Sequence, residues 1–230
     1  MTIKISREPH LAEKIVMVGG LDGCGKTLLS PIISALERVE LPTYSYEIEQ
    51  YCALNSLNEL SLDTASALIR MQTDYKLYNS MMGREVNFRP SDLSSVLKYH
   101  NPTQYFERLF KPGDEVIPDI VQKFNPILNL TIHNVLYISD AIWSGLGERC
   151  VYIEVVRHPL YMVRQQSLNM KNLVNDVRDF IIYYSYKGNK FPYWVRGWEE
   201  KFVKSSRIER SILLINELTQ RTNIAKKRLK

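Results

Sequence analysis

The sequence predicts an α/β fold of three layers, in which helices flank a central, mostly parallel sheet. Short apolar runs alternate with long helical patterns along the 230 residues. Two of these runs, residues 14–20 and 149–156, have the continuous apolar character of buried parallel strands. The chain has no internal repeat and no evident linker, so we expect one domain spanning residues 1–230.

The first quarter of the chain reads as strand, helix and strand. After the strand at residues 14–20, the pattern of residues 25–39 predicts a helix with an apolar stripe. Pro31 falls in its first turns, where proline is best tolerated. Residues 41–51 then read as a second strand and its exit.

A long helix is expected over residues 61–83, with Gly83 as its stop. Large apolar or aromatic side chains recur there at spacings of three and four residues, which predicts one buried face. That face would hold Leu68, Met71, Tyr75, Tyr78 and Met82. The next segment, residues 87–119, contains four prolines and is expected to form loops and short helices over the sheet.

The second half of the chain predicts three more helices. Residues 125–147 read as one helix, and residues 158–170 open another directly after the strand at 149–156. Ser206 and Glu209 have the spacing of a capping box before a C-terminal helix.

Composition favours a globular protein of the cytoplasm. Hydrophobic residues make up 45% and charged residues 24% of the chain, and no apolar run approaches the roughly 20 residues of a membrane span. The N-terminus is polar and lacks the apolar core of a signal peptide. Cys24, Cys52 and Cys150 have no metal-like spacing, so we expect them to be reduced.

The net charge of +5 is mild, but five basic residues and no acidic one fall in residues 221–230. Such a cluster suits a nucleic acid or an anionic membrane, and it equally suits the solvated end of a helix. No aromatic residues are interleaved with it, so no nucleic-acid partner is expected.

The most specific motif is VGGLDGCGKT, residues 18–27, which fits the Walker A pattern G-x-x-x-x-G-K-[ST] of a nucleotide-binding P-loop. Glycines let several backbone N–H groups approach a phosphate, and the following helix adds its positive end. Lys26 would bring a full charge, and Thr27 a hydroxyl for magnesium or for a phosphate oxygen. The predicted phosphate-binding residues are Gly20, Gly23, Cys24, Gly25, Lys26 and Thr27.

The loop alone does not identify the reaction. A magnesium-dependent kinase or hydrolase usually has an acidic residue at the end of a neighbouring strand. The sequence offers Glu47, Glu49 and Asp140, none in a clear second phosphate-loop motif. Arg84 and Arg89 are the candidates for an arginine-bearing lid.

A second anion site is predicted where Arg157 ends a strand and His158-Pro159 opens a helix that carries Ser167. With this arrangement the sequence resembles the P-loop sulfotransferase superfamily, bacterial sulfotransferase-like proteins included, whose donor is 3′-phosphoadenosine-5′-phosphosulfate (PAPS). The resemblance implies that the loop holds the 5′-phosphosulfate and that Arg157 and Ser167 hold the 3′-phosphate. Ser167 lies ten residues after Arg157, whereas the family spacing of eight falls on Gln165.

The resemblance covers roughly residues 14–202, and the chain ends where the family often continues into another strand, as in a shortened member. It implies that Glu47, in the segment YEIEQY, is the base for the acceptor hydroxyl. Glu49 and His133 are the alternative bases.

The expected function is therefore sulfuryl transfer from PAPS to a hydroxyl of a small molecule or carbohydrate, with Lys26 and Glu47 as catalytic residues and no metal required. Trp194 and Trp198 could form a platform for a sugar ring or simply pack in the core. One alternative is a small-molecule kinase that uses ATP with magnesium, and another is a non-catalytic nucleotide-binding protein.

Overall fold

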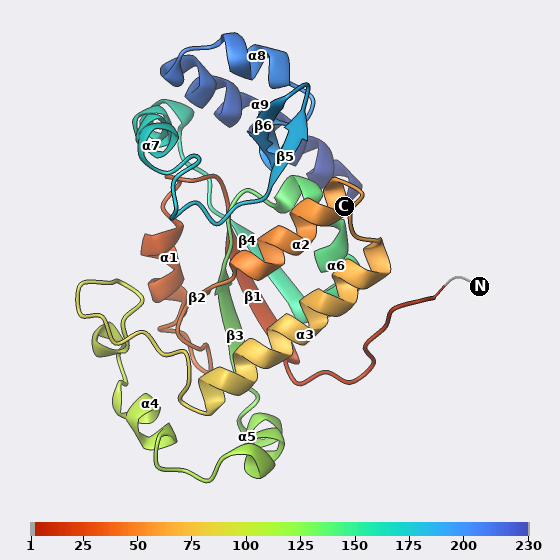
Figure 1. The fold of residues 1–230 in the computed structure, drawn as a ribbon. Helices are drawn as coiled ribbons and strands as arrows, with labels where there is room; N and C mark the ends of the chain where they lie inside the picture. The colour runs from red at the N-terminus through yellow and green to blue at the C-terminus, as the bar shows by residue number, and fades with distance from the viewer. Residues whose placement is uncertain (1–2, 230) are drawn as a thin grey trace.

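A four-stranded, all-parallel sheet with the strand order β2-β3-β1-β4 forms the centre of the protein (Figure 1). The computed structural model describes residues 3–229. The strands are β1 (Lys14–Gly19), β2 (Thr43–Tyr44), β3 (Ile127–Thr131) and β4 (Cys150–Glu154). The α/β class predicted from the sequence is confirmed.

Helices cover both faces of this sheet, because side chains alternate along each strand. Val16 and Val18 of β1 pack toward α1 (Lys26–Ile33). Ile15 and Met17 point the other way and join the main core with the helices of the opposite face. Those helices are α2 (Tyr46–Ser56), α3 (Leu62–Met81) and α6 (Asp140–Leu146). Helix, sheet and helix are the three layers predicted from the sequence.

The irregular segment between α3 and β3 lies at the end of the sheet where the strands begin (Figure 1). It holds α4 (Thr103–Arg108), α5 (Ile117–Phe124) and single 3₁₀ turns at Val96–Lys98 and Asp114–Val116. Loops and short helices are confirmed there. Their place differs from the prediction, since they close the amino end of the sheet and leave its faces to the long helices.

The remaining elements gather at the carboxyl end of the strands (Figure 1). They are α7 (Pro159–Asn172), the hairpin of β5 (Tyr183–Tyr186) and β6 (Asn189–Pro192), α8 (Glu199–Lys204) and α9 (Arg207–Arg228). The capping box predicted at Ser206 and Glu209 is present at the start of α9. Trp194 and Trp198 are each 4% exposed within a second core, so they pack rather than form an open platform.

The prediction of one helix over residues 125–147 is wrong. This region contains β3, a 3₁₀ turn at Leu136–Ile138 and then α6. The run ILNLT is short and apolar, and periodicity alone cannot distinguish a buried strand from a buried helix turn. The helix predicted over 25–39 is also too long, because α1 ends at Ile33.

Two predictions of burial are wrong as well. Met71 and Tyr75 of α3 are 49% and 55% exposed, whereas the buried face holds Ile69, Leu77 and Met81 together with small or polar side chains. The spacing of three and four residues predicts the helix but misplaces part of its buried face. α6 packs on α3 through the close approach of Gly145 to Ser66, and such a contact favours small residues on the face of α3 that meets α6. The run at 149–156 is only partly buried, since β4 is an edge strand and Val151 is 61% exposed.

The second predicted strand is present but very short. β2 has two residues, and the segment YEIEQY that was read as its exit forms the first turns of α2. Glu47 and Glu49 therefore lie on a helix, about 200° apart around its axis. They point in different directions although they are close in sequence.

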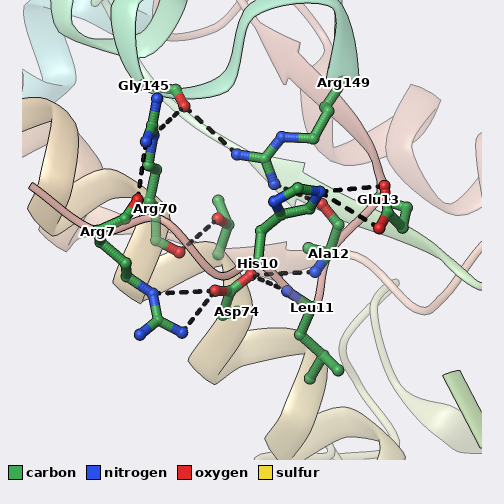
Figure 2. Close-up of polar contacts among 10 residues, drawn as sticks. Arg7, His10, Leu11, Ala12, Glu13, Arg70, Asp74, Gly145 and Arg149 are labelled. Carbon is green, nitrogen blue, oxygen red and sulfur yellow. Dashed lines mark hydrogen bonds and ion pairs between the residues drawn. The ribbon is translucent and has the colours of Figure 1, made fainter. Parts of the chain in front are cut away.

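The N-terminal segment is fastened to α3 by Asp74 (Figure 2). Asp74 is 4% exposed, and its Oδ1 accepts hydrogen bonds from the backbone N–H groups of Leu11 (2.8 Å) and Ala12 (3.0 Å). Its Oδ2 accepts from Nε (3.1 Å) and Nη2 (2.8 Å) of Arg7. One carboxylate thus satisfies four donors of the segment that leads into β1.

We expect Asp74→Ala to lower the free energy of unfolding by about 2–3 kcal/mol, because buried donors would lose their only acceptor. Urea denaturation measures this loss. Asp63→Ala is the matched control, since Asp63 lies on the same helix and the bonds that it accepts, from the backbone of Ile5 and the hydroxyl of Ser61, are exposed. A loss in Asp63→Ala as large as that in Asp74→Ala would contradict the assignment.

Candidate functional site

A glycine-rich loop joins β1 to α1 at the carboxyl end of the sheet. Gly20, Gly23 and Gly25 have φ values of 141°, 80° and 111°, a region that side-chain-bearing residues rarely adopt. A Cβ at Gly20 would lie 2.5 Å from the carbonyl oxygen of Val155, whereas a Cβ at Gly25 would meet nothing within 4 Å. The loop is therefore tight against β4 on one side and open at Gly25, directly before α1.

Lys26, the first residue of α1, turns its side chain back over the loop. Its Nζ donates hydrogen bonds of 2.9 Å to the carbonyl oxygens of both Gly20 and Leu21. The residue is only 4% exposed, and no carboxylate within residues 3–229 forms an ion pair with it. A positive charge that is not neutralised by the protein is thus held at the loop.

The other two loop residues named from the motif have distinct surroundings. Cys24 is buried, and its Sγ lies 3.8 Å from Lys26 Nζ, within a small apolar cluster that includes Met162 and Ile215. Thr27 lies in the first turn of α1, where its Oγ1 is 3.3 Å from the hydroxyl of Tyr44. Cys24 therefore packs behind the loop, whereas Thr27 presents a hydroxyl at the sheet edge.

Arg157 reaches the same loop from the end of the neighbouring strand. Its Nη1 donates to the carbonyl oxygen of Gly23 (3.1 Å), and its guanidinium lies over the ring of Tyr161 (5.7 Å to the centroid). The residue is exposed. Two cationic groups, one from the first residue of α1 and one from the segment after β4, therefore flank one glycine loop.

Two polar side chains of α7, Gln165 and Gln166, also approach the loop. Gln166 donates to the carbonyl oxygen of Asp22 (2.9 Å), and Gln165 carbons lie 3.1 Å from where a Cβ on Gly23 would be. Ser167 lies about 100° farther around the helix and forms no side-chain hydrogen bond within the described part of the chain. The structure thus brings Gln165, at the eight-residue spacing from Arg157, to the loop.

Glu47 lies outside the cavity that adjoins the loop. Its Oε1 is 3.5 Å from Nζ of Lys76, and its Oε2 accepts from the hydroxyl of Ser45 (3.2 Å). The Glu47 carboxylate is therefore already paired with a buried lysine of α3 and hydrogen-bonded to Ser45, the N-cap residue of its own helix.

Glu49 and His133 meet in a cavity of ≈190 Å³ beside the loop, which Asp22 also borders. Oε1 of Glu49 lies 2.8 Å from both the backbone nitrogen and Nδ1 of His133. Burial raises the pKa of Glu49, although the hydrogen bonds and charge of His133 oppose this and Asp22 adds to it. Glu49 and His133, the two alternative bases predicted from the sequence, therefore lie side by side.

Two tyrosines fix the imidazole of His133. The rings of Tyr44 and Tyr46 stack near it, with centroids at 5.8 and 5.9 Å. When Glu49 is ionised, Nδ1 donates to it and Nε2 keeps its lone pair. The arrangement can accept a proton from a hydroxyl placed at Nε2.

A second cavity, of ≈260 Å³, lies on the other side of the loop. Gly20, Cys24 and Arg157 border it, together with Thr222 and Lys226 of α9. Lys226 is paired with Glu154, and Arg228 lies 3.8 Å from Asp140. Two basic residues of the C-terminal cluster, Lys226 and Arg228, are therefore paired with carboxylates of the protein itself. Lys230 lies outside the described residues.

Among residues 3–229, no group of three or more His, Cys, Asp or Glu side chains has the arrangement of a metal site. None of the helices in the same range has both the length and the hydrophobicity of a transmembrane span. Comparisons of the chain with protein-family models, with curated proteins and with solved structures found no match.

Proposed function

We propose that this protein is a PAPS-dependent sulfotransferase that transfers a sulfuryl group to the hydroxyl of a small molecule or carbohydrate. The observation that carries the proposal is the convergence of Lys26 and Arg157 on one glycine loop, with the Glu49–His133 pair in the adjoining cavity. Such a site combines anion binding with a proton acceptor, as transfer to a hydroxyl requires. The all-parallel sheet supports it, since ligands of such sheets bind at the carboxyl ends of the strands.

The residues present fit a nucleotide with phosphates at two positions. The open backbone at Gly25 and the N-terminus of α1 suit the 5′-phosphosulfate, with Lys26 beside it. Arg157 is exposed and can form charge-assisted hydrogen bonds with a 3′-phosphate. In this proposal Gln165 assists Arg157, because it faces the loop and Ser167 does not.

When bound, PAPS supplies the activated sulfuryl group, and the chain's own residues perform the remaining tasks. His133 accepts the hydroxyl proton at Nε2, and Glu49 holds the imidazole by its bond to Nδ1. We assign the base to this pair because Glu47 is engaged with Lys76 outside the cavity. Lys26 stabilises the negative charge that grows on the leaving phosphate.

The proposal places the protein in the cytoplasm. All three cysteines are free and buried, which suits a reducing compartment. The partners proposed are the nucleotide donor and a small acceptor.

Calorimetric titration with adenosine 3′,5′-bisphosphate, and separately with ATP plus magnesium, tests the donor. We expect the bisphosphate to bind more tightly, and we expect Arg157→Ala to weaken it about tenfold to a hundredfold, the usual worth of a hydrogen bond between charged groups. Arg164→Ala is the control, since Arg164 is an exposed arginine of α7 that forms no hydrogen bond to the loop within residues 3–229.

Preferential binding of magnesium-ATP would favour the small-molecule kinase instead. Bisphosphate affinity that is unchanged in Arg157→Ala would refute the assignment of the second phosphate site. Tight binding without transfer to any hydroxyl in an acceptor panel would favour the non-catalytic nucleotide-binding protein.

A further inference from the structure

A cavity of ≈680 Å³ lies at the amino end of the sheet, opposite the glycine loop. It opens between the segment after α1, the end of α3, and helices α4 and α5, which lie below the strands in Figure 1. Pro126, the residue before β3, also borders it. Its volume exceeds that of either cavity beside the loop and falls within the roughly 300–1,000 Å³ typical of ligand sites.

Most of the wall of this cavity is apolar. The side chains come from three helices and the turns beside them, and they include Met81, Met82, Leu109, Ile117, Ile120 and Phe124. Leu109 and Phe124 are 49% and 55% exposed, and Leu36 at the same border is 61% exposed. Single exposed apolar side chains are ordinary, whereas apolar surface gathered around one cavity is typical of a ligand-binding groove.

Arg108 adds a hydrogen-bond donor to this apolar wall. It is 7% exposed and borders the cavity, and its Nη1 and Nη2 donate to Glu40 and Ser80. Within residues 3–229 its Nε donates no hydrogen bond, and this nitrogen is not sealed from solvent as the unpartnered Oδ1 of Asn129 is. Glu40 already neutralises the guanidinium, so the free donor suits the oxygen of a neutral hydroxyl or carbonyl group.

The charges at the rim of the cavity balance each other. Apart from the buried pair, two acidic and two basic side chains border it, and all four are exposed: Glu37, Glu107, Arg38 and Lys111. None of them forms an ion pair within the described part of the chain. The rim therefore does not select an ion, and a charged group that entered the apolar part would lose its hydration without gaining a partner.

We infer that this cavity binds a neutral, mostly apolar molecule that carries one hydroxyl or carbonyl oxygen, such as a fatty alcohol. The apolar body packs on the side chains of Met81, Met82 and Ile120, and the oxygen accepts a hydrogen bond from Nε of Arg108. The inference is independent of the proposed function, because the cavity and the glycine loop lie at opposite ends of the sheet.

Methyl NMR of the full chain, labelled at the methionine methyl groups, tests the inference with three probes that share a decyl chain. The probes are decanol, decanoate and decylammonium. We expect decanol to shift the signals of Met81 and Met82 and to bind about tenfold or more tightly than either ion, because the ions lose hydration against the apolar wall. Met162 and Met170 are internal controls, since they border the two cavities beside the loop.

Ile120→Trp is expected to weaken the binding of decanol about tenfold or more, because the indole takes up the space that the decyl chain would fill. Val203→Trp is the matched control, since Val203 is 52% exposed on α8 and does not border this cavity. A thermal melt shows whether each variant is folded, and Leu109→Trp replaces Ile120→Trp if the latter is not.

The inference is overturned if Met81 and Met82 do not shift, if Ile120→Trp leaves the binding of decanol intact, or if either ion binds as tightly as decanol. Shifts of Met81 and Met82 that depend on protein concentration without any probe would assign the cavity to a second copy and overturn it too. Shifts confined to Met162 and Met170 would place decanol beside the loop, with the same consequence. None of these results bears on the proposed sulfotransferase, which the bisphosphate titration tests separately.

Discussion

Lys26→Met is expected to lower kcat/KM for sulfuryl transfer by about 10²–10³-fold or more, the cost of removing a group that stabilises developing charge. The methionine keeps the apolar stem of a side chain that is 4% exposed, and it loses the ammonium that lies 2.9 Å from two loop carbonyl oxygens. A single-turnover assay with labelled PAPS measures the loss in the chemical step.

Lys76→Met is the matched control, because Lys76 is also a buried lysine but lies on α3 beside Glu47. We expect it to transfer sulfuryl groups at close to the wild-type rate. Transfer retained in Lys26→Met would remove the loop from the reaction. Transfer lost in Lys76→Met as well, with the fold intact, would return the role of base to Glu47.

The loop could be predicted from the sequence because everything it needs is local. Three glycines with positive φ, the lysine after them and the start of α1 lie within eight consecutive residues. The capping box at Ser206 and Glu209 was predictable for the same reason. In both cases, neighbouring residues specify the backbone conformation without help from the rest of the fold.

The Glu49–His133 pair could be named but not assembled, because its members are 84 residues apart. Their meeting depends on β3, which was read as part of a helix, and on α2, which was read as the exit of a strand. His133 follows β3 by two residues, and so it points into the site only when β3 pairs with β1. Long-range parallel pairing is the information that a local pattern does not contain.

The structure also shows why residues from distant parts of the chain converge. β1 leads into the loop, β3 into His133 and Asn134, and β4 into Arg157. In a parallel sheet these three carboxyl ends lie side by side, so each crossover brings one polar group to the same edge. At the amino end of the sheet, by contrast, the ion pair of Glu40 and Arg108 stabilises the fold.

Arg108→Met is expected to lower the free energy of unfolding by about 3–5 kcal/mol at pH 7, because it leaves the buried carboxylate of Glu40 without its cation. The two side chains are 6% and 5% exposed and form a bidentate pair at 2.7 and 2.8 Å. The hydroxyls of Ser80 and Tyr105 also donate to Glu40.

The pH dependence of this loss distinguishes an unpaired charge from a packing defect. Burial by itself raises the pKa of Glu40, but the hydrogen bonds and charge of Arg108, with those of Ser80 and Tyr105, hold the pKa below its usual value of 4.5. A lowered pKa stabilises the fold above about pH 4.5 and ceases to do so as the pH falls through the folded-state value. Without Arg108, burial raises the pKa of Glu40, and the carboxyl can take up a proton in the folded variant as the pH falls. The difference between Arg108→Met and the wild type should therefore shrink between pH 7 and pH 4, as measured by urea denaturation.

The double variant Glu40→Gln/Arg108→Met should be more stable than Arg108→Met at pH 7, because the buried charge is gone. Lys187→Met provides the surface comparison, since the pair of Lys187 and Glu200 is exposed and should contribute little. A loss in Arg108→Met that is the same at both pH values and is not relieved in the double variant would show that the guanidinium acts by filling space over the Tyr105 ring, 4.5 Å from its centroid. The expected result instead makes Glu40 the reason that a segment with four prolines holds a fixed place at the start of the strands, opposite the site where the chemistry is proposed.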